Sequence, residues 1–334
     1  MNRLIILLSM TIFMWSCNED ETESCAETPE DVQTVQFDFV DLQDSILNLD
    51  TKTSLVSFLS RHPEVRDYIF RRNEYPNDSA FINQLYDRFR HPSFDTLAME
   101  TEKVFDDLSQ LKSQFAEAFS NIKAYYPEFK PPIVKTIITG LDSDLLVSDS
   151  IIVVSLDFYL GDGAKYQPRI YEYLLRRYGP EDIVPSCILM FGISERFNKG
   201  DLKDKTVLAE MIAYGKSFYF AKRTLPCVPD SVFLWYTAEE MRGSRKNEDM
   251  IWARLIQDKV IHSTSMIDKR NYLGERPFTI QVGEKCPGRI AQWIGWRIVE
   301  AYMKSHPQTT LPELMAISDA QELFRESKYK PQKR

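Results

Sequence analysis

The chain has 334 residues, of which 43% are hydrophobic and 12% aromatic, so it is long enough for an apolar core and too hydrophobic to be disordered. Forty-one basic and 49 acidic residues give a net charge of −8, and the lysines and arginines are spread along the chain. Because nucleic-acid binding depends on a concentrated basic footprint, this balance argues against a nucleic-acid partner.

The first residues have the pattern of a lipoprotein signal. Arg3 precedes an apolar run from Leu4 to Trp15, which is too short to cross a bilayer comfortably and is followed at once by acidic sequence. The run ends in Met14-Trp15-Ser16-Cys17, which resembles a bacterial lipobox, in which the cysteine becomes the acylated first residue of the mature protein. We therefore expect residues 1–16 to be a signal peptide and Cys17 to carry the lipid that anchors the chain to a membrane. The alternative is an ordinary signal peptide with an incidental cysteine.

An acidic segment follows the signal. Residues 18–51 contain eleven acidic residues and no basic one. This composition predicts a solvated tether, so residues 17–51 are interpreted as a lipidated acidic tether. Its first residues, Asn18-Glu19-Asp20-Glu21, resemble the export signal that sends some Bacteroidetes-type lipoproteins to the cell surface; a plain spacer is the alternative. Four cysteines remain, and the sequence does not decide between bridges and free thiols for Cys25, Cys187, Cys227 and Cys286.

Residues 52–334 predict a helix-rich globular domain, with an N-terminal helical part at 52–130 and an α+β part at 131–334. Apolar periodicity and Pro63 predict two short helices within Thr53–Phe70. Asp78 is expected to cap a helix that ends at His91-Pro92. The strongest periodicity, from Phe105 to Ile122, predicts a helix of about six turns that ends at Tyr126-Pro127.

Strand patterns appear only after Pro132. Residues 133–139 and 151–160 are β-branched runs, and the second is apolar on both sides, as expected for an inner strand. Residues 278–282 predict a further short strand. The fold class is therefore α+β, predominantly helical, with a small sheet packed against helices.

Helices are expected at 166–178, 182–197 and 206–220, the last with Asp204 as its N-cap, and again from Pro287, which suits a first helical turn. Small residues at Gly288, Ala291 and Gly295 leave one side of that final helix thin, which predicts the close approach of another element. Capping boxes are expected at three places, namely Thr237–Glu240, Thr310–Glu313 and Ser318–Gln321.

The sequence contains no recognisable catalytic or phosphate-binding motif, and it implies no metal and no cofactor. Asp157 interrupts an apolar strand pattern, and Glu210 and Tyr214 share one helical face. Arg289 at a helix start has the chemistry to bind an anion. These four residues are candidates for a polar pocket; the alternative is that they are buried polar links between elements.

Several segments in collinear order resemble the GldB-type gliding-motility-associated lipoprotein family, namely LDFYLG (156–161), LAEMIAYGKSFYF (208–220), LPCVPD, ERPFTIQV, CPGRIAQWIGWRIVEAYM and SKYKP (327–331). The family is similar in layout to zincin-like metallopeptidases, in which the corresponding helix carries a metal-binding glutamate before a glycine. This chain has Tyr214 before Gly215 and no HExxH, so the resemblance implies a peptidase-like scaffold without its zinc site.

Together these features predict a lipid-anchored cell-envelope protein, acylated by palmitate-like chains, that supports gliding motility or its associated secretion machinery through protein contacts, without catalysis. Its expected partners are the membrane, through the N-terminal lipid, and other envelope or gliding proteins. Two alternatives are an envelope hydrolase with an unfamiliar site and a surface binder of glycan or peptide. The sequence leaves open whether the domain faces the periplasm or the cell surface.

Overall fold

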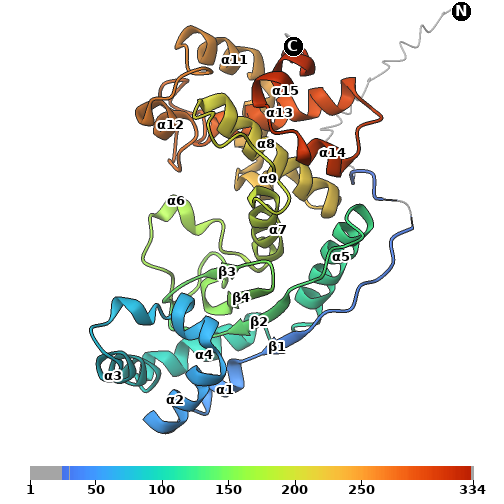
Figure 1. The fold of residues 1–334 in the computed structure, drawn as a ribbon. Coiled ribbons are helices and arrows are strands. Elements are labelled where there is room, and N and C mark those ends of the chain that lie inside the picture. Colours follow the sequence, from blue (N-terminus) through green and yellow to red (C-terminus); the bar gives the residue numbers. More distant parts are fainter. Residues whose placement is uncertain (1–24, 30, 332–334) are drawn as a thin grey trace, which may run out of the picture.

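The structure is a computed structural model that describes residues 25–29 and 31–331 (Figure 1). The expected signal peptide, the lipidation site Cys17 and the Asn18–Glu21 segment lie outside the described residues.

A small four-stranded sheet lies at the centre of the chain's fold. It consists of β1 (Phe39–Asp41), β2 (Ile133–Ile137), β3 (Leu145–Val147) and β4 (Ile151–Ser155), in the order β1-β2-β4-β3. β1, β2 and β4 are parallel, with Val134 opposite Ile152, and β3 is antiparallel to β4. Alternate residues of β4 enter two different apolar cores, because successive side chains of a strand point to opposite faces. The sheet is therefore buried on both sides, as its apolar strands predict.

One face of the sheet packs on the N-terminal helices. These are α1 (Gln43–Leu47), α2 (Lys52–Arg61), α3 (Asp78–Phe89) and α4 (Pro92–Val104), with short turns of helix at Val65–Ile69 and Arg72–Glu74. Their apolar side chains form one core with Ile137 and Val153 of the sheet. Figure 1 shows these helices gathered at one end of the molecule.

The other face packs on α5 (Ser109–Tyr125) and the C-terminal helices, which share a second and larger core. These helices are α7 (Ile183–Ile193), α8 (Val207–Thr224), α9 (Asp230–Leu234), α10 (Ala238–Lys246), α11 (Glu248–Gln257), α12 (Met266–Tyr272), α13 (Ile290–Ser305), α14 (Leu311–Ala316) and α15 (Ala320–Ser327). The short helix α6 (Glu172–Leu175) has no buried residue. The predicted α+β class, mainly helical with a small sheet packed against helices, is confirmed.

The expectation of a solvated tether is wrong from Val35 onward, where the backbone N–H of Val35 donates to the hydroxyl of Ser120 at 3.0 Å. Phe37 packs edge-on against Phe119 at 5.1 Å, β1 joins the sheet, and Ile46 is buried. A disulfide joins Cys25 to Cys227, while Cys187 and Cys286 are free thiols. The segment is acidic in composition, but apolar residues alternate with the acidic ones. These apolar residues pack the segment against the domain.

Several local predictions were wrong at their boundaries. The long Phe105 helix begins only at Ser109, because Phe105 is the C-cap of the separate helix α4. The strand expected at 151–160 ends at Ser155 and continues as a 3-10 turn, and 278–282 forms only a bridge from Phe278 to Pro287. Residues 166–178 contain only the short helix α6.

The helix caps were predicted unevenly. The boxes at Thr237–Glu240 and Thr310–Glu313 are present, and Pro63 does separate two helical segments. Asn77 rather than Asp78 caps α3, Thr206 rather than Asp204 caps α8, and Asp319 rather than Ser318 caps α15. Helix α13 starts at Ile290, so Pro287 lies before its first turn.

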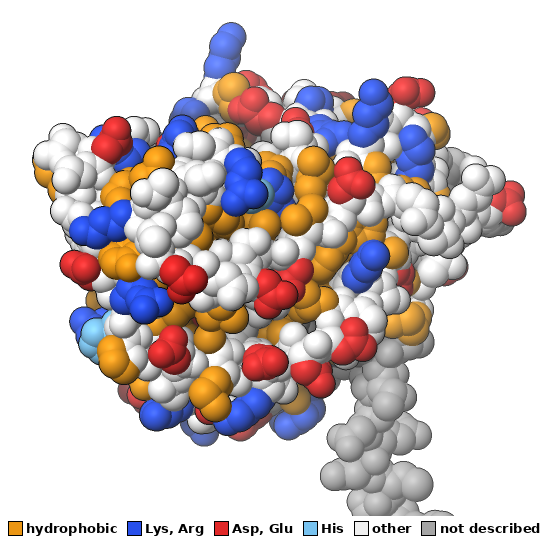
Figure 2. All heavy atoms as spheres, turned by 90° about the horizontal axis from the view of Figure 1, so that it is seen from below, with side chains coloured by type: hydrophobic (Ala, Val, Ile, Leu, Met, Phe, Trp, Pro, Cys, Tyr) orange, Lys and Arg blue, Asp and Glu red, His pale blue; other side chains and the backbone are white. Residues whose placement is uncertain are grey.

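The face seen from below in Figure 2 carries basic, acidic and apolar side chains interspersed with one another. No single sign of charge dominates this face. Within the described residues, no helix is long and apolar enough to cross a membrane.

Candidate functional site

Two glycines bring α8 and α13 into backbone contact. A Cβ atom added to Gly215 of α8 would lie 2.3 Å from the carbonyl oxygen of Gly295 in α13, and a Cβ on Gly295 would lie 1.9 Å from the carbonyl oxygen of Met211. Any side chain at either position would push the helices apart. The predicted close approach at Gly295 is therefore confirmed, and its partner is the helix that carries Glu210 and Tyr214.

A cleft of about 360 Å³ opens beside this crossing. Its walls come from α7, α8, the start of α13 and the segments before β3 and after α9. Much of the lining is apolar, including Leu189, Phe218 and the exposed side chains of Met190 and Ile193. The cleft therefore exposes apolar surface to solvent, on the side of the sheet that is covered by the C-terminal helices.

Polar groups gather around Trp235 at one side of the cleft. The guanidinium of Arg289 lies 4.6 Å from the centroid of the indole ring and that of Arg177 lies 5.1 Å from it, both within cation–π range. One carboxylate, Glu275, pairs with both arginines, at 3.1 Å from Arg177 Nη1 and 3.6 Å from Arg289 Nε. One carboxylate thus faces two guanidinium groups, so the cluster of Arg177, Arg289 and Glu275 has a positive net charge.

The backbone at this cluster is unusual. Trp235 and Arg289 both adopt left-handed conformations, with φ of 51° and 59°, which few residues other than glycine adopt. Arg289 is buried and donates a hydrogen bond to the carbonyl of Leu234, while burial lowers the pKa of its guanidinium and Glu275 opposes that shift. The indole Nε1 of Trp235 is buried and has no acceptor among the described residues. Strained backbone and an unused donor are features that functional sites often share.

The structure brings together three of the four predicted pocket residues. Tyr214 and Arg289 line the cleft. Glu210 lies one turn before Tyr214 and accepts a hydrogen bond from Lys269 of α12 at 2.6 Å. Burial raises the pKa of the Tyr214 hydroxyl, and the nearby carboxylate of Glu210 raises it further.

Asp157 lies apart from this cleft. Its buried carboxylate accepts hydrogen bonds from the backbone N–H groups of Thr139, at 3.0 Å, and Leu141, at 2.7 Å. Between these residues the chain turns through Gly140 and Leu141, both with positive φ. Burial raises the pKa of Asp157, and the N–H donors oppose the shift. The carboxylate of Asp157 therefore stabilises the turn that follows β2.

Two of the hydroxyl groups that line the cleft are already engaged. Ser217 donates to the carbonyl of Leu189 at 2.8 Å, and Tyr178 donates to Asp144 at 2.9 Å. Burial, helped by Asp144, raises the pKa of Tyr178 to about 12, so this hydroxyl keeps its proton at neutral pH. Among the described residues, no three His, Cys, Asp or Glu side chains gather as a metal ion would need. The arrangement suits recognition of an apolar group with a polar end.

Sequence reasoning missed Arg177, Trp235 and Glu275. These residues come from three different segments, and Arg177 and Glu275 are 98 positions apart. None belongs to a local motif. The one available signal was the aromatic-rich run Phe233-Leu234-Trp235-Tyr236 directly before a capping box.

Fold and cleft together define a helix-rich α+β protein with a two-sided sheet and an apolar, arginine-bearing cleft between its C-terminal helices. The family model described as gliding motility protein GldB matches residues 24–331, and the chain therefore belongs to the GldB family. This membership implies involvement in gliding motility. No curated protein and no solved structure matches the chain. The zincin-like layout implied by the resemblance stays an expectation.

Proposed function

We propose that this chain is a lipid-anchored cell-envelope protein that supports gliding motility, or the secretion machinery associated with it, by holding another envelope protein in the cleft beside α8. Family membership and the Cys17 lipobox support the location and the process. The cleft supports the mode of action.

The observation that carries the contact is the exposed apolar wall of the cleft. The side chains of Met190 and Ile193 are 43% and 40% exposed, although both belong to a helix whose other apolar residues are buried, apart from the half-buried Leu189. Exposed apolar groups beside an indole ring and two guanidiniums match an apolar peptide segment that also presents carbonyl or carboxylate oxygens. Such a segment would bury the methionine and isoleucine and would place its oxygens near the arginines.

Gliding tests this role. Cells lacking the gene are expected to lose spreading on agar, and the wild-type gene should restore it. The Met190→Glu protein should accumulate normally but fail to restore spreading, because the new carboxylate would lie on the apolar wall of the cleft. Met99→Glu, which changes a 59% exposed methionine on α4, is the matched control and should restore spreading. Full spreading with Met190→Glu would exclude the cleft as the contact.

We propose further that the protein acts without catalysis. The resemblance places Tyr214 where a peptidase helix carries a metal ligand, and the serine and tyrosine hydroxyls of the cleft that were described above donate to a backbone carbonyl and to a carboxylate. Metal analysis and a peptide-library cleavage assay on the purified protein test this proposal. Bound zinc, or turnover that Tyr214→Phe abolishes, would establish the hydrolase alternative instead.

Lipid attachment has its own test. Metabolic labelling with a palmitate analogue should label the wild-type protein at its mature size, and Cys17→Ala should be unlabelled. A labelled alanine variant would place the anchor elsewhere.

A further inference from the structure

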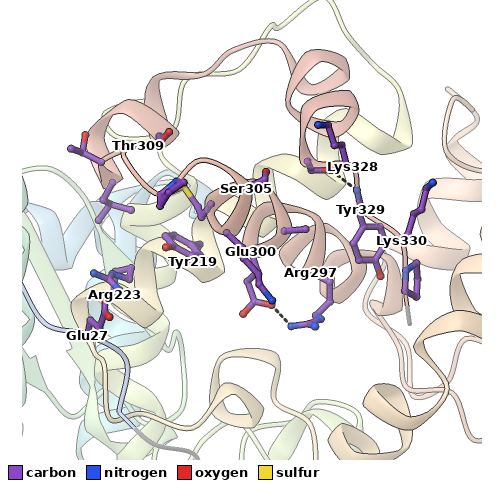
Figure 3. A pocket seen from close by; sticks show the side chains of 18 of the residues that line it. Glu27, Tyr219, Arg223, Arg297, Glu300, Ser305, Thr309, Lys328, Tyr329 and Lys330 are labelled. Atoms are coloured by element: carbon purple, nitrogen blue, oxygen red, sulfur yellow. Dashed lines mark hydrogen bonds and ion pairs between the residues drawn. The ribbon is translucent and has the colours of Figure 1, made fainter. Parts of the chain in front are cut away.

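A second and larger hollow lies along the C-terminal halves of α8 and α13 (Figure 3). It has a volume of about 1,020 Å³ and is closed on one side by residues 327–331 at the end of the described chain. Figure 3 shows Tyr219, Glu300 and Arg297 between Arg223 on one side and Tyr329 and Lys330 on the other. This basic hollow, as we call it, is separate from the cleft that contains Tyr214 and Arg289.

The basic hollow has the opposite charge to the chain as a whole. Six basic and three acidic side chains line it, although the chain carries −8, and the basic ones are Arg223, Arg245, Arg297, Lys304, Lys328 and Lys330. All three acidic side chains form ion pairs with two of the arginines. Arg297 pairs with Glu248 at 3.1 Å and with Glu300, and Arg223 pairs with Glu27 at 3.7 Å.

Three lysines account for the excess positive charge. Lys304, Lys328 and Lys330 are exposed, and none forms an ion pair with another described residue. Lysine ammonium groups at the edge of an open hollow are suited to oxygen-rich anions such as phosphates, which they bind as point charges.

The N-terminal segment places this hollow beside the expected lipid. The disulfide fixes Cys25 to Cys227, just beyond the end of α8, the N–H of Ala26 donates to the carbonyl of Pro226 at 3.0 Å, and Glu27 itself lines the hollow. Cys17 lies eight positions before Cys25, and a fully extended chain spans at most about 3.6 Å per residue, or roughly 29 Å. If Cys17 is acylated, the hollow therefore cannot be far from the headgroups of the leaflet that holds the lipid.

We propose that the basic hollow binds the phosphate-bearing headgroups of anionic lipids, so that the domain rests on its own membrane with the hollow toward the bilayer. This inference rests on the lipid anchor of the proposed function. The acyl chains would supply attachment, and the hollow would supply orientation. With the hollow on the membrane, the cleft beside α8 would be held at a fixed distance and direction from the bilayer.

A vesicle-binding assay tests the headgroup interaction separately from acylation. The protein is the whole chain after the signal peptide with Cys17→Ser, so that no lipid is attached. It should co-sediment with vesicles containing phosphatidylglycerol and not with phosphatidylcholine alone, and binding should weaken as salt is added because exposed charges are screened.

The triple variant Lys304→Ser, Lys328→Ser and Lys330→Ser should weaken this binding about a hundredfold, since each lysine near an anionic surface is worth roughly a factor of five. The matched control replaces three lysines that are also exposed and outside the hollow, namely Lys112, Lys130 and Lys203. Both triples change the net charge equally, and the control should bind within about a factor of two of the unsubstituted protein, because its lysines lie outside the docking face.

Three results would overturn the proposal. Equal losses in the two triple variants would show an effect of net charge alone. Full competition by millimolar inorganic phosphate would indicate a site for a free anion rather than a docking face. Binding that appears only after residues 18–24 are removed would mean that the chain's own acidic segment competes for the hollow. A failure of headgroup binding would leave the palmitate-labelling result unchanged. Binding by the basic hollow and acylation of Cys17 can therefore be rejected separately.

Discussion

Substitution of Gly215 by alanine tests the backbone contact between α8 and α13, the two helices beside which the cleft opens. The added methyl group would lie 2.3 Å from the carbonyl oxygen and 2.4 Å from the carbonyl carbon of Gly295, whereas ordinary contacts begin near 3.4 Å. Both contacting atoms are backbone, so no side-chain rotation relieves the clash. Helices α8 and α13 must separate by about 1 Å, which also loosens the stacked Phe218 and Trp296 rings at 5.4 Å.

The expected cost follows from two opposing terms. Alanine is favoured over glycine within a helix by about 1 kcal/mol. Overpacking a closely packed interior costs about 1–3 kcal/mol, and a backbone clash belongs at the upper end of that range. We therefore expect Gly215→Ala to lower the free energy of unfolding by about 2 kcal/mol.

Urea unfolding followed by tryptophan fluorescence measures this change, because Trp296 lies beside the crossing. The matched control is Gly243→Ala in α10, where an added Cβ meets no atom within 4 Å. Without a clash the control should gain up to about 1 kcal/mol. A Gly215→Ala protein that is as stable as the wild type, or that gains like the control, would refute the backbone contact between the two helices.

Three further predictions concern the disulfide and two buried side chains. Replacing Cys25 and Cys227 by serine opens a loop with a sequence separation of 202 and should cost up to about 5 kcal/mol in the free energy of unfolding, measured with urea; no loss would mean that the bridge does not form. Burial lowers the pKa of Lys216 to about 8, although its ammonium donates to three backbone carbonyls. The native state therefore releases this proton at lower pH than the unfolded state, so the free energy of unfolding should rise between about pH 8 and pH 10.5. In urea titrations at several pH values, the Lys216→Met protein should lack the part of this rise that Lys216 contributes. Asp157→Ala leaves the buried N–H of Thr139 and the partly buried N–H of Leu141 without their acceptor and should destabilise by about 2–5 kcal/mol. Asp162→Ala, in the exposed loop after β4, should change little.

Local chemistry was predictable from the sequence. The boxes at Thr237 and Thr310 depend on residues three positions apart, and both are present. The thin side of α13 at Gly295 correctly required a close neighbour. Periodicity failed at Phe105, because a buried residue at the end of one helix continued the spacing of the next and hid the break between them.

The remaining features depend on contacts between distant segments. The disulfide joins residues 202 positions apart, and no spacing of Cys25 and Cys227 signals it. The arginines around Trp235 come together only after α6, α9 and α13 have packed. Candidate residues on one helical face, such as Tyr214, could be proposed from the sequence, but the groups opposite them could not.

The central claim, that a partner occupies the cleft beside α8, is tested most directly by photo-crosslinking in gliding cells. A photoreactive amino acid at position 190 should give one discrete adduct of higher mass, and Trp235→Ala should abolish this adduct by removing the ring over which Arg177 and Arg289 lie. The same amino acid at position 99, which is also exposed but lies on α4, should give no such adduct. No adduct at position 190, or the same adduct from both positions, would contradict the account.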